Sequence, residues 1–314
     1  MGYLVTNLSK DFKDKLALHD VSFSIKDGEI ISILGKNGAG KTTLIKILTG
    51  LLNKTSGDVF YNDINLIYLK SSYYKSIGVV LEGDRNTYWY LSGLENILYF
   101  GRLHKMNDSE IHGRAEKLLK HFSLYDDRKK KVSHYSRGMK QKLSIIIGLI
   151  NNPKVLFLDE PTLGLDVWSK NSLIELIQSY VVSHNITVIM TSHQLDIVES
   201  LAKRVILLDE GKIMYDGDIQ KLIGNEDSIY EIVFYGDISL VKKIGRGLRL
   251  ISQKKEEEAN CVRVEADIET ILNFSQTLIQ EGCKIEGINK VKRSLEQVIL
   301  NNWGVAEHDI LHKS

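Results

Sequence analysis

The chain has 314 residues, of which 43% are hydrophobic and 26% charged, and its formal net charge is +1. This length favours two domains, and the near-zero charge gives no reason to expect a general attraction to nucleic acid or acidic lipid. The apolar runs are far shorter than the roughly 20 residues of a membrane-spanning helix. Two cysteines, Cys261 and Cys283, and an N-terminus that reads directly as a strand favour a reducing cytosol.

Strands and helices alternate along the first two thirds of the chain, which is the pattern of an α/β domain. Residues 18–25 read as a half-buried strand. Residues 29–34, 154–158 and 186–190 are nearly all apolar, as strands covered on both faces should be. Residues 205–215 read as a hairpin.

Between about residues 92 and 150 the spacing of apolar residues changes to that of helices. We expect a helix that begins after a cap at Asp108 or Ser109. Its inward face would hold Ile111, Ala115, Leu118, Leu119 and Phe122. The segment therefore reads as a helical insertion inside the α/β domain.

A small α+β accessory domain is predicted over residues 226–314, after an α/β domain over residues 1–225. Strands are expected first, and then a helix over residues 267–280. Four residues of this helix are expected to face inward: Ile268, Ile271, Leu272 and Leu278. A capping box over residues 294–297 predicts a last helix, which Gly304 would end.

The strongest chemical signal lies between the strand at 29–34 and the helix after it. It matches the phosphate-binding P-loop pattern, in the run Gly35-Lys36-Asn37-Gly38-Ala39-Gly40-Lys41-Thr42-Thr43. Glycines let backbone N–H groups face phosphate oxygens, and the helix start adds partial positive charge. We expect Lys41 to reach the β- and γ-phosphates and Thr42 to bind Mg²⁺. A plain glycine-rich turn is the alternative, which this context disfavours.

A second acidic signal follows the apolar strand at 154–158. This strand ends in Asp159 and Glu160. Beside a P-loop, Asp159 is expected to bind the metal, and Glu160 to polarise the attacking water. Without a P-loop, two solvent-facing acids at the end of a strand would be the commoner explanation.

Five motifs occur here in the order seen in ATP-binding-cassette (ABC) proteins. They are the P-loop, Ser136–Gln141, Asp159–Thr162, Gly164–Asp166 and Thr191–His193. Over about residues 1–220 the chain resembles an ABC transporter ATPase subunit of the exporter type, with a small C-terminal extension. The resemblance implies a mixed core sheet, an antiparallel β subdomain and a helical insertion, with ATP and Mg²⁺ as ligands.

The resemblance also implies that two such domains enclose two ATP molecules, each P-loop facing the signature motif of the other domain. Ser136 and Gly138 would then contact the opposite γ-phosphate, and Asp166 would line the interface of a dimer of two identical chains. Catalysis would rely on Lys41, Glu160 and His193, the last of which holds the γ-phosphate and the water. Phe12 matches the aromatic residue that stacks on adenine, although a lone phenylalanine is more often a core residue.

Two positions depart from the family pattern. Arg137 replaces a signature glycine, while the serine and the second glycine remain. Glu82 stands where the family usually has a glutamine that contacts Mg²⁺ and the membrane partner. Both changes resemble those of exporter-type cassettes.

The function implied by the resemblance is ATP hydrolysis that powers separate membrane-spanning permease subunits. The chain would lie in the cytoplasm, on the inner face of the cell membrane. Residues 83–104, rich in aromatic side chains, would dock the permease or else form the core of the insertion. The alternative is a soluble ABC ATPase that acts on ribosomes or DNA. A single P-loop and the lack of a heptad run disfavour that alternative, so no nucleic-acid partner is expected.

Overall fold

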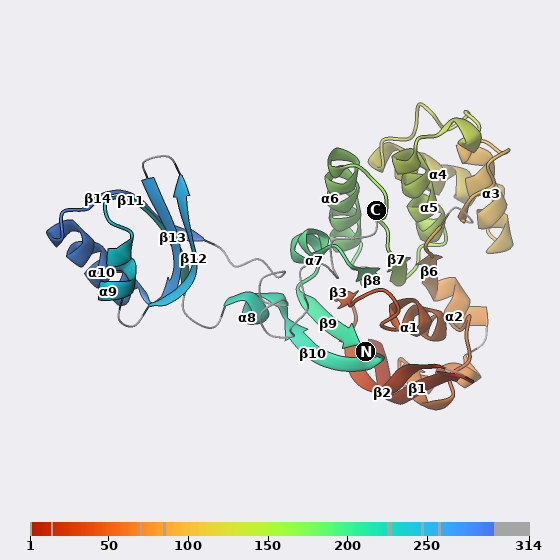
Figure 1. Cartoon of the computed structure of the whole chain (residues 1–314). Coiled ribbons are helices and arrows are strands. Elements are labelled where there is room, and N and C mark those ends of the chain that lie inside the picture. The colour runs from red at the N-terminus through yellow and green to blue at the C-terminus, as the bar shows by residue number, and fades with distance from the viewer. Residues whose placement is uncertain are drawn as a thin grey trace. The chain divides into compact units, whose positions relative to one another are not determined.

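The computed structural model describes residues 2–13, 15–69, 71–83, 86–224, 228–245, 248–256 and 259–291. The chain divides into two compact units, one up to Ile219 and one from Gln220 (Figure 1). Residue 225, where the sequence places a domain boundary, lies outside the described residues. The two units are therefore described separately.

A six-stranded sheet forms the centre of the first unit. Five strands run parallel, and the sixth, Lys212–Asp218, pairs antiparallel at one edge. In sheet order they are β10 (Lys212–Asp218), β9 (Arg204–Asp209), β3 (Ile30–Leu34), β8 (Thr187–Ser192), β7 (Val155–Asp159) and β6 (Ile77–Val80). The predicted mixed sheet, its buried strands and the hairpin are confirmed.

A second, antiparallel sheet packs against the first. Its order is β2 (Lys15–Lys26), β1 (Gly2–Phe12), β4 (Ser56–Tyr61) and β5 (Ile64–Asn65). Leu18, Val21, Phe23 and Ile25 of β2 are buried as predicted, and burial alternates from Val21 to Ile25. Tyr3 of β1 contacts Phe157 of β7 with ring centroids 5.9 Å apart, so both sheets share one hydrophobic core.

Helices cover this core. α1 buries Leu44, Ile45 and Leu48 directly after the phosphate loop. The connecting helices and 3₁₀ turns of this unit are α1 (Lys41–Leu48), η1 (Leu66–Tyr68), α2 (Ser71–Ser76), η3 (Val132–His134), α6 (Val167–Ser183) and α7 (Leu195–Leu201). The short helix α8 (Ile219–Gly224) begins at the last residue of this unit and continues into the second. Among the described residues, no helix is both long and apolar enough to cross a membrane.

The predicted helical insertion consists of α3 (Gly93–Leu103), α4 (Asp108–His121) and α5 (Arg137–Leu149). The predicted inward face of α4 is buried. The predicted cap is wrong, because Asn107 caps the helix by accepting a hydrogen bond from Glu110 N at 2.8 Å. Asp108 is instead the first helical residue, and its carboxylate accepts hydrogen bonds from the guanidinium group of Arg102.

The second unit is a four-stranded antiparallel sheet with two helices. Its elements follow the order β–α–β–β–α–β, and the sheet order β12-β13-β11-β14 is that of a ferredoxin-like arrangement. Apolar residues of both helices pack on the sheet in one core. The elements are β11 (Ser228–Tyr235), α9 (Ser239–Ile244), β12 (Arg249–Glu256), β13 (Ala259–Ala266), α10 (Ile268–Gln280) and β14 (Lys284–Val291).

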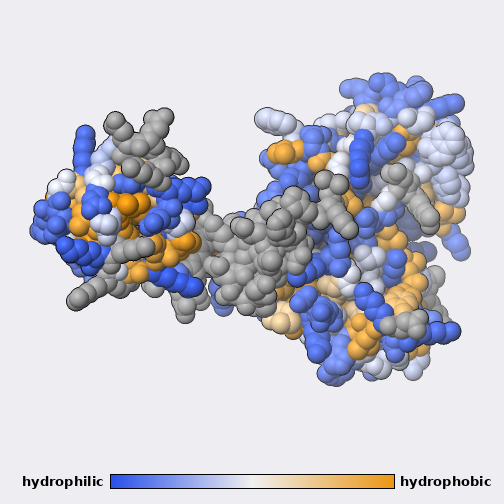
Figure 2. Space-filling model, viewed as in Figure 1, coloured by the Kyte–Doolittle hydropathy of each residue, from blue (hydrophilic) through white to orange (hydrophobic). Residues whose placement is uncertain are grey.

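The helix α10 differs in part from its prediction. Ile271 and Leu278 are buried as expected, but Ile268 and Leu272 are 52% and 57% exposed. The apolar stripe of α10 is wider than the area that the sheet covers. Figure 2 shows apolar side chains at the surface of this unit, among hydrophilic ones. The helix predicted from Ser294 lies outside the described residues.

Candidate nucleotide-binding site

The predicted phosphate loop joins the end of β3 to the start of α1. Gly38 and Gly40 have φ angles of 82° and 106°, which favour glycine, and Gly40 is the N-cap of α1. No side chain caps this helix, so the N–H groups of its first turn have no side-chain acceptor there. Such a helix start offers N–H groups and partial positive charge to an anion.

Lys41 is buried beside this loop, with 6% of its surface exposed. Its Nζ donates to the carbonyl oxygens of Gly35 and Lys36 at 2.7 and 3.1 Å. It also lies 3.7 Å from Glu160 Oε1. Burial lowers the pKa of the ammonium group, and the Glu160 and Asp159 carboxylates oppose this shift. The ammonium group is thus held at the loop by contacts that phosphate oxygens can replace.

Asp159 ends β7 and is 1% exposed. Its Oδ1 accepts hydrogen bonds from Thr42 Oγ1 at 3.2 Å and Thr191 Oγ1 at 2.6 Å, whereas its Oδ2 has no hydrogen-bond partner in the protein. A buried carboxylate oxygen without a partner is costly unless a ligand or water completes it. Oxygen ligands are those that Mg²⁺ prefers, so Asp159 and Thr42 fit a Mg²⁺ ion that takes its other ligands from water and phosphate.

Glu160 follows in a left-handed backbone conformation, with φ 49°. Such a conformation is uncommon for a residue other than glycine and is often found at functional sites. Its N–H donates to Thr191 Oγ1 at 3.0 Å, and its Oε2 lies 2.9 Å from His193 Nδ1. This hydrogen bond raises the pKa of the imidazole, against the opposing effect of burial. The Glu160 carboxylate therefore lies between the ammonium group of Lys41 and the imidazole of His193.

An open pocket of about 510 Å³ forms where the phosphate loop meets the turn between β1 and β2. Ten of the residues predicted to bind nucleotide or metal, or to act in catalysis, line it together. They are Phe12, Asn37, Gly38, Gly40, Lys41, Thr42, Thr43, Glu82, Glu160 and His193. The structure therefore brings most of the predicted site into one place.

Phe12 lies at the pocket with 45% of its surface exposed. The Nζ of Lys10 lies 4.8 Å from the centroid of its ring. Phe12 is thus no core residue, and its ring has surface available for a flat partner such as a nucleotide base.

Some predicted residues support the loop instead of lining this pocket. A Cβ at Gly35 would lie 2.2 Å from the Leu208 carbonyl oxygen, and Ala39 is 4% exposed, so both face protein. Lys36 contributes its carbonyl oxygen to Lys41. These positions shape the loop for the residues that line the pocket.

Three lining residues were missed by the sequence analysis: Lys15, Ala17 and Leu163. Lys15 pairs with Phe12 across the β1–β2 turn, which brings its side chain to the pocket. Only the strand register carries this signal, because no motif includes Lys15.

The residues predicted to act on the nucleotide of a second copy lie outside this pocket. Ser136 is the N-cap of α5 and accepts a hydrogen bond from Met139 N at 3.2 Å. Asp166 is the N-cap of α6 and accepts hydrogen bonds from Ser169, which lower the pKa of its carboxyl group. Within the described part of the chain, Ser136, Gly138 and Asp166 are not among the residues that line the pocket around Lys41.

Comparison with known proteins decides the family. The family model described as ABC transporter matches residues 18–163. Over 228 residues the chain is 36% identical to the ABC transporter ATP-binding protein NatA of Bacillus subtilis, which covers 71% of this chain and 92% of NatA. The chain belongs to the ABC transporter family. This ABC protein is also 36% identical over 228 residues to the doxorubicin resistance ATP-binding protein DrrA of Mycobacterium tuberculosis, over 71% of the chain and 67% of DrrA.

A solved structure connects the fold to the reaction. The dimeric ATP-binding cassette MJ0796, in a post-hydrolysis state bound to ADP and Pi, is 28% identical and has a TM-score of 0.62. The match covers 69% of this chain and 98% of MJ0796. The predicted family, α/β fold and ATPase activity are confirmed: this chain is the ATP-binding, ATP-hydrolysing protein of an ABC transporter. The roles of single residues stay predictions.

Proposed function

We propose that this ABC ATPase serves an exporter and drives separate membrane-spanning subunits through ATP-dependent dimerisation. The observation that carries the proposal is the buried group of Lys41, Asp159 and Glu160 beside the phosphate loop. Buried charges cost folding free energy unless they are well paired. Stability therefore does not explain why these charges are buried, whereas a role in ATP hydrolysis does.

Each residue of the group has a distinct task in the proposed reaction. Lys41 binds the β- and γ-phosphates, while Phe12 stacks on adenine. Glu160 accepts a proton from the attacking water. His193, held by the Glu160 carboxylate, orients that water and the γ-phosphate.

Thr42 and Asp159 would hold Mg²⁺, with Glu82 at the edge of the site. The bound ion supplies charge neutralisation to the β- and γ-phosphates. The Glu82 carboxylate contributes to the pKa of both Lys41 and His193, so it lies within electrostatic reach of the site. Its role as a third metal ligand belongs to the proposal.

A second copy of the chain would complete each site. Ser136, Gly138 and Asp166 would reach the γ-phosphate bound by the other copy. Exposed apolar residues directly after Asp166 support this idea, since Val167 is 66% and Trp168 87% exposed. A partner surface that covers them would remove apolar area from water.

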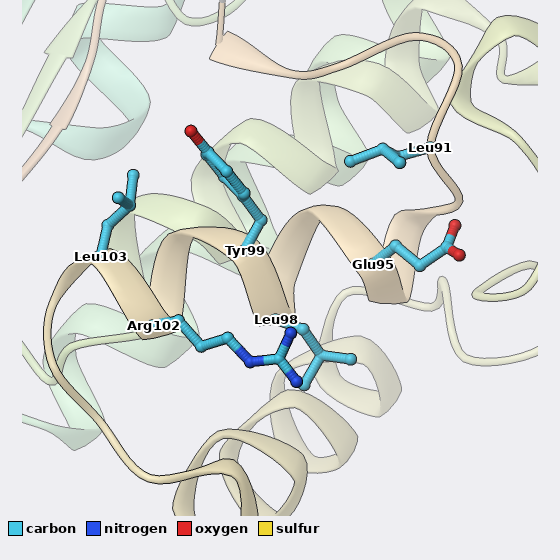
Figure 3. A pocket seen from close by; sticks show the side chains of 6 residues that line it. All are labelled: Leu91, Glu95, Leu98, Tyr99, Arg102 and Leu103. Carbon is cyan, nitrogen blue, oxygen red and sulfur yellow. The ribbon is translucent and has the colours of Figure 1, made fainter.

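The helix α3 and the segment before it form the proposed docking surface for the permease. A pocket of about 470 Å³ is lined by Leu91, Glu95, Leu98, Tyr99, Arg102 and Leu103 (Figure 3). Trp89 and Leu103 are 68% and 61% exposed, so this segment does not serve only as the core of the insertion. Its lining combines apolar side chains with Glu95 and Arg102, which suits an amphipathic partner helix.

Export and a place on the inner face of the membrane are the finer parts of the proposal. The name of DrrA, a doxorubicin resistance protein, supports an outward direction. Relatives named for transport favour a permease over ribosomes or DNA as the partner.

Sequencing of the neighbouring genes should identify a multi-span membrane protein, and co-purification with it would test the docking. Leu103→Ser should lower recovery with the membrane partner and leave the ATPase activity of the isolated chain unchanged. Ile67→Ser, at an equally exposed apolar position outside this surface, is the matched control. Salt-sensitive retention on RNA or DNA without membrane recovery would contradict the proposal.

A further inference from the structure

Arg137 lies against the loop that leads from β7 to α6. Gly164 in this loop has φ 71°, and a Cβ built on it would lie 2.1 Å from Cζ and 2.3 Å from both terminal nitrogens of Arg137. The guanidinium group therefore fills the space that a side chain at position 164 would occupy. Its three nearly equal distances mean that it presents its flat face to Gly164.

This loop connects two residues of the proposed reaction. It begins at Glu160 and ends at Asp166, the N-cap of α6. A turn within it is closed by the hydrogen bond from Leu163 N to Glu160 O at 3.2 Å. The contact with Arg137 thus ties the first turn of α5 to a short, constrained segment.

A second contact joins the same two regions. A Cβ built on Gly138 would lie 3.5 Å from the Cβ and Oγ of Ser169, in the first turn of α6. Ser169 donates hydrogen bonds to Asp166 from its N at 3.0 Å and from its Oγ at 2.7 Å. The starts of α5 and α6 therefore pack closely, with the loop between them.

We propose that Arg137 is a positioning residue that locks the Glu160–Asp166 loop to the start of α5. The inference rests on the proposed function, in which Ser136 serves the nucleotide of a second copy while Glu160 serves that of its own chain. The loop begins at Glu160, and Ser136 caps α5. The contact between the loop and α5 therefore couples the position of Glu160 in one nucleotide site to that of Ser136 in the other. The planar guanidinium group suits this face-on contact, which the point charge of a lysine does not reproduce.

Charge alone is the competing explanation. Arg137 lines a cleft of about 310 Å³ together with Glu82 and Glu160, so its positive charge also acts on these carboxylates. Lys140, on the same turn of α5, lines the same cleft. It is absent from the three nearest atoms around Gly164, all of which belong to Arg137. Arg137→Lys keeps a positive charge in the cleft and removes the face-on contact, so it separates the two explanations.

A double-mutant cycle tests the lock on the full chain with its membrane partner. Arg137→Ala should lower kcat about fivefold and leave KM for ATP within about twofold, since neighbouring side chains that couple show effects of this size. Gly164→Ala displaces the guanidinium group, so adding Arg137→Ala to it should lower kcat no further. Arg137→Lys should behave like Arg137→Ala if the contact matters, and should keep wild-type kcat if only the charge does.

Losses that multiply in the double variant would overturn the lock, and so would recovery of kcat by Arg137→Lys. If Gly164→Ala fails to fold, the Arg137→Lys variant alone decides the question. The proposed function fails separately, when Glu160→Gln shows no dimer with Mg-ATP. A dimer with an additive cycle would therefore remove only the role of Arg137.

Discussion

The two units of the chain differ in the charge and the hydrogen-bond partners of their buried polar side chains. In the first unit, three charged residues are buried around the phosphate loop, and one Asp159 oxygen has no partner in the protein. In the described part of the second unit, the buried polar residues are Asn260 and Ser275, and each donates to a backbone carbonyl at 2.8 and 2.7 Å.

This difference distinguishes the first unit, whose buried charges suit a ligand, from the second unit, whose buried polar groups have partners in the protein. A core whose few polar groups are satisfied needs no ligand to explain it. Buried charges with an unpaired oxygen do need one, because they cost folding free energy when nothing completes them. Among the described residues, those that suit catalysis therefore lie in the first unit.

The largest effect is expected for Lys41→Ala. The phosphates lose the one buried ammonium group at the loop, so ATPase activity should fall at least about 100-fold, as when one electrostatic group is removed from other active sites. Steady-state phosphate release measures this. Lys46→Ala, in the last turn of the same helix, is the control. Activity near that of the wild type in Lys41→Ala would remove the lysine from the site.

Glu160→Gln should bind ATP but hydrolyse it about 100-fold more slowly, because the amide cannot accept the proton of the attacking water. Nucleotide affinity and single-turnover hydrolysis, measured on one sample, separate the two effects. Equal loss of binding and hydrolysis would point to a structural role for the carboxylate.

His193 should make stability depend on pH. Its pKa is raised in the folded chain, so its contribution is fully present below the unfolded pKa and is lost as pH rises through the folded pKa. His193→Gln should therefore destabilise the chain more at about pH 5.5 than at about pH 9. Urea denaturation at both values tests this, with His19→Gln, an exposed residue of β2, as control. A pH-independent difference would contradict the ion pair with Glu160.

Glu82→Gln should remain active and shift the Mg²⁺ concentration for half-maximal turnover. The amide still offers a neutral oxygen, but one negative charge near the cation is gone. At ~4 Å and a dielectric constant near 20 one charge pair is worth about 4 kcal/mol before repulsion from the phosphates offsets it. Mg²⁺ titrations of both proteins check this, and superimposable curves would exclude Glu82 from the metal site.

Removal of the second unit should have the smallest effect on the nucleotide pocket. A chain ending at Gly224 keeps every residue that lines it. It should bind ATP with unchanged affinity, and its association should change through loss of the exposed α10 stripe. Loss of ATP binding by a well-folded truncated chain would contradict the assignment of the nucleotide pocket to the first unit.

Sequence motifs predicted many residues of the pocket because the residues within the phosphate loop, and those at the end of β7, follow one another along the chain. Lys15 was missed since only the register of β1 and β2 brings it there. The exposure of Ile268 and Leu272 depends on how much of α10 the sheet covers, which periodicity does not reveal. The contact between Arg137 and Gly164 joins separate segments, so no local pattern predicts it.

The most direct test of the account is the mass of Glu160→Gln in solution. Light scattering should show a monomer without nucleotide and a dimer with Mg-ATP, because unhydrolysed ATP holds two P-loops against two signature motifs. Adding Ser136→Ala should weaken the dimer while each chain still binds ATP. A Glu160→Gln chain that binds Mg-ATP and stays monomeric, alone and beside its membrane partner, would contradict the account.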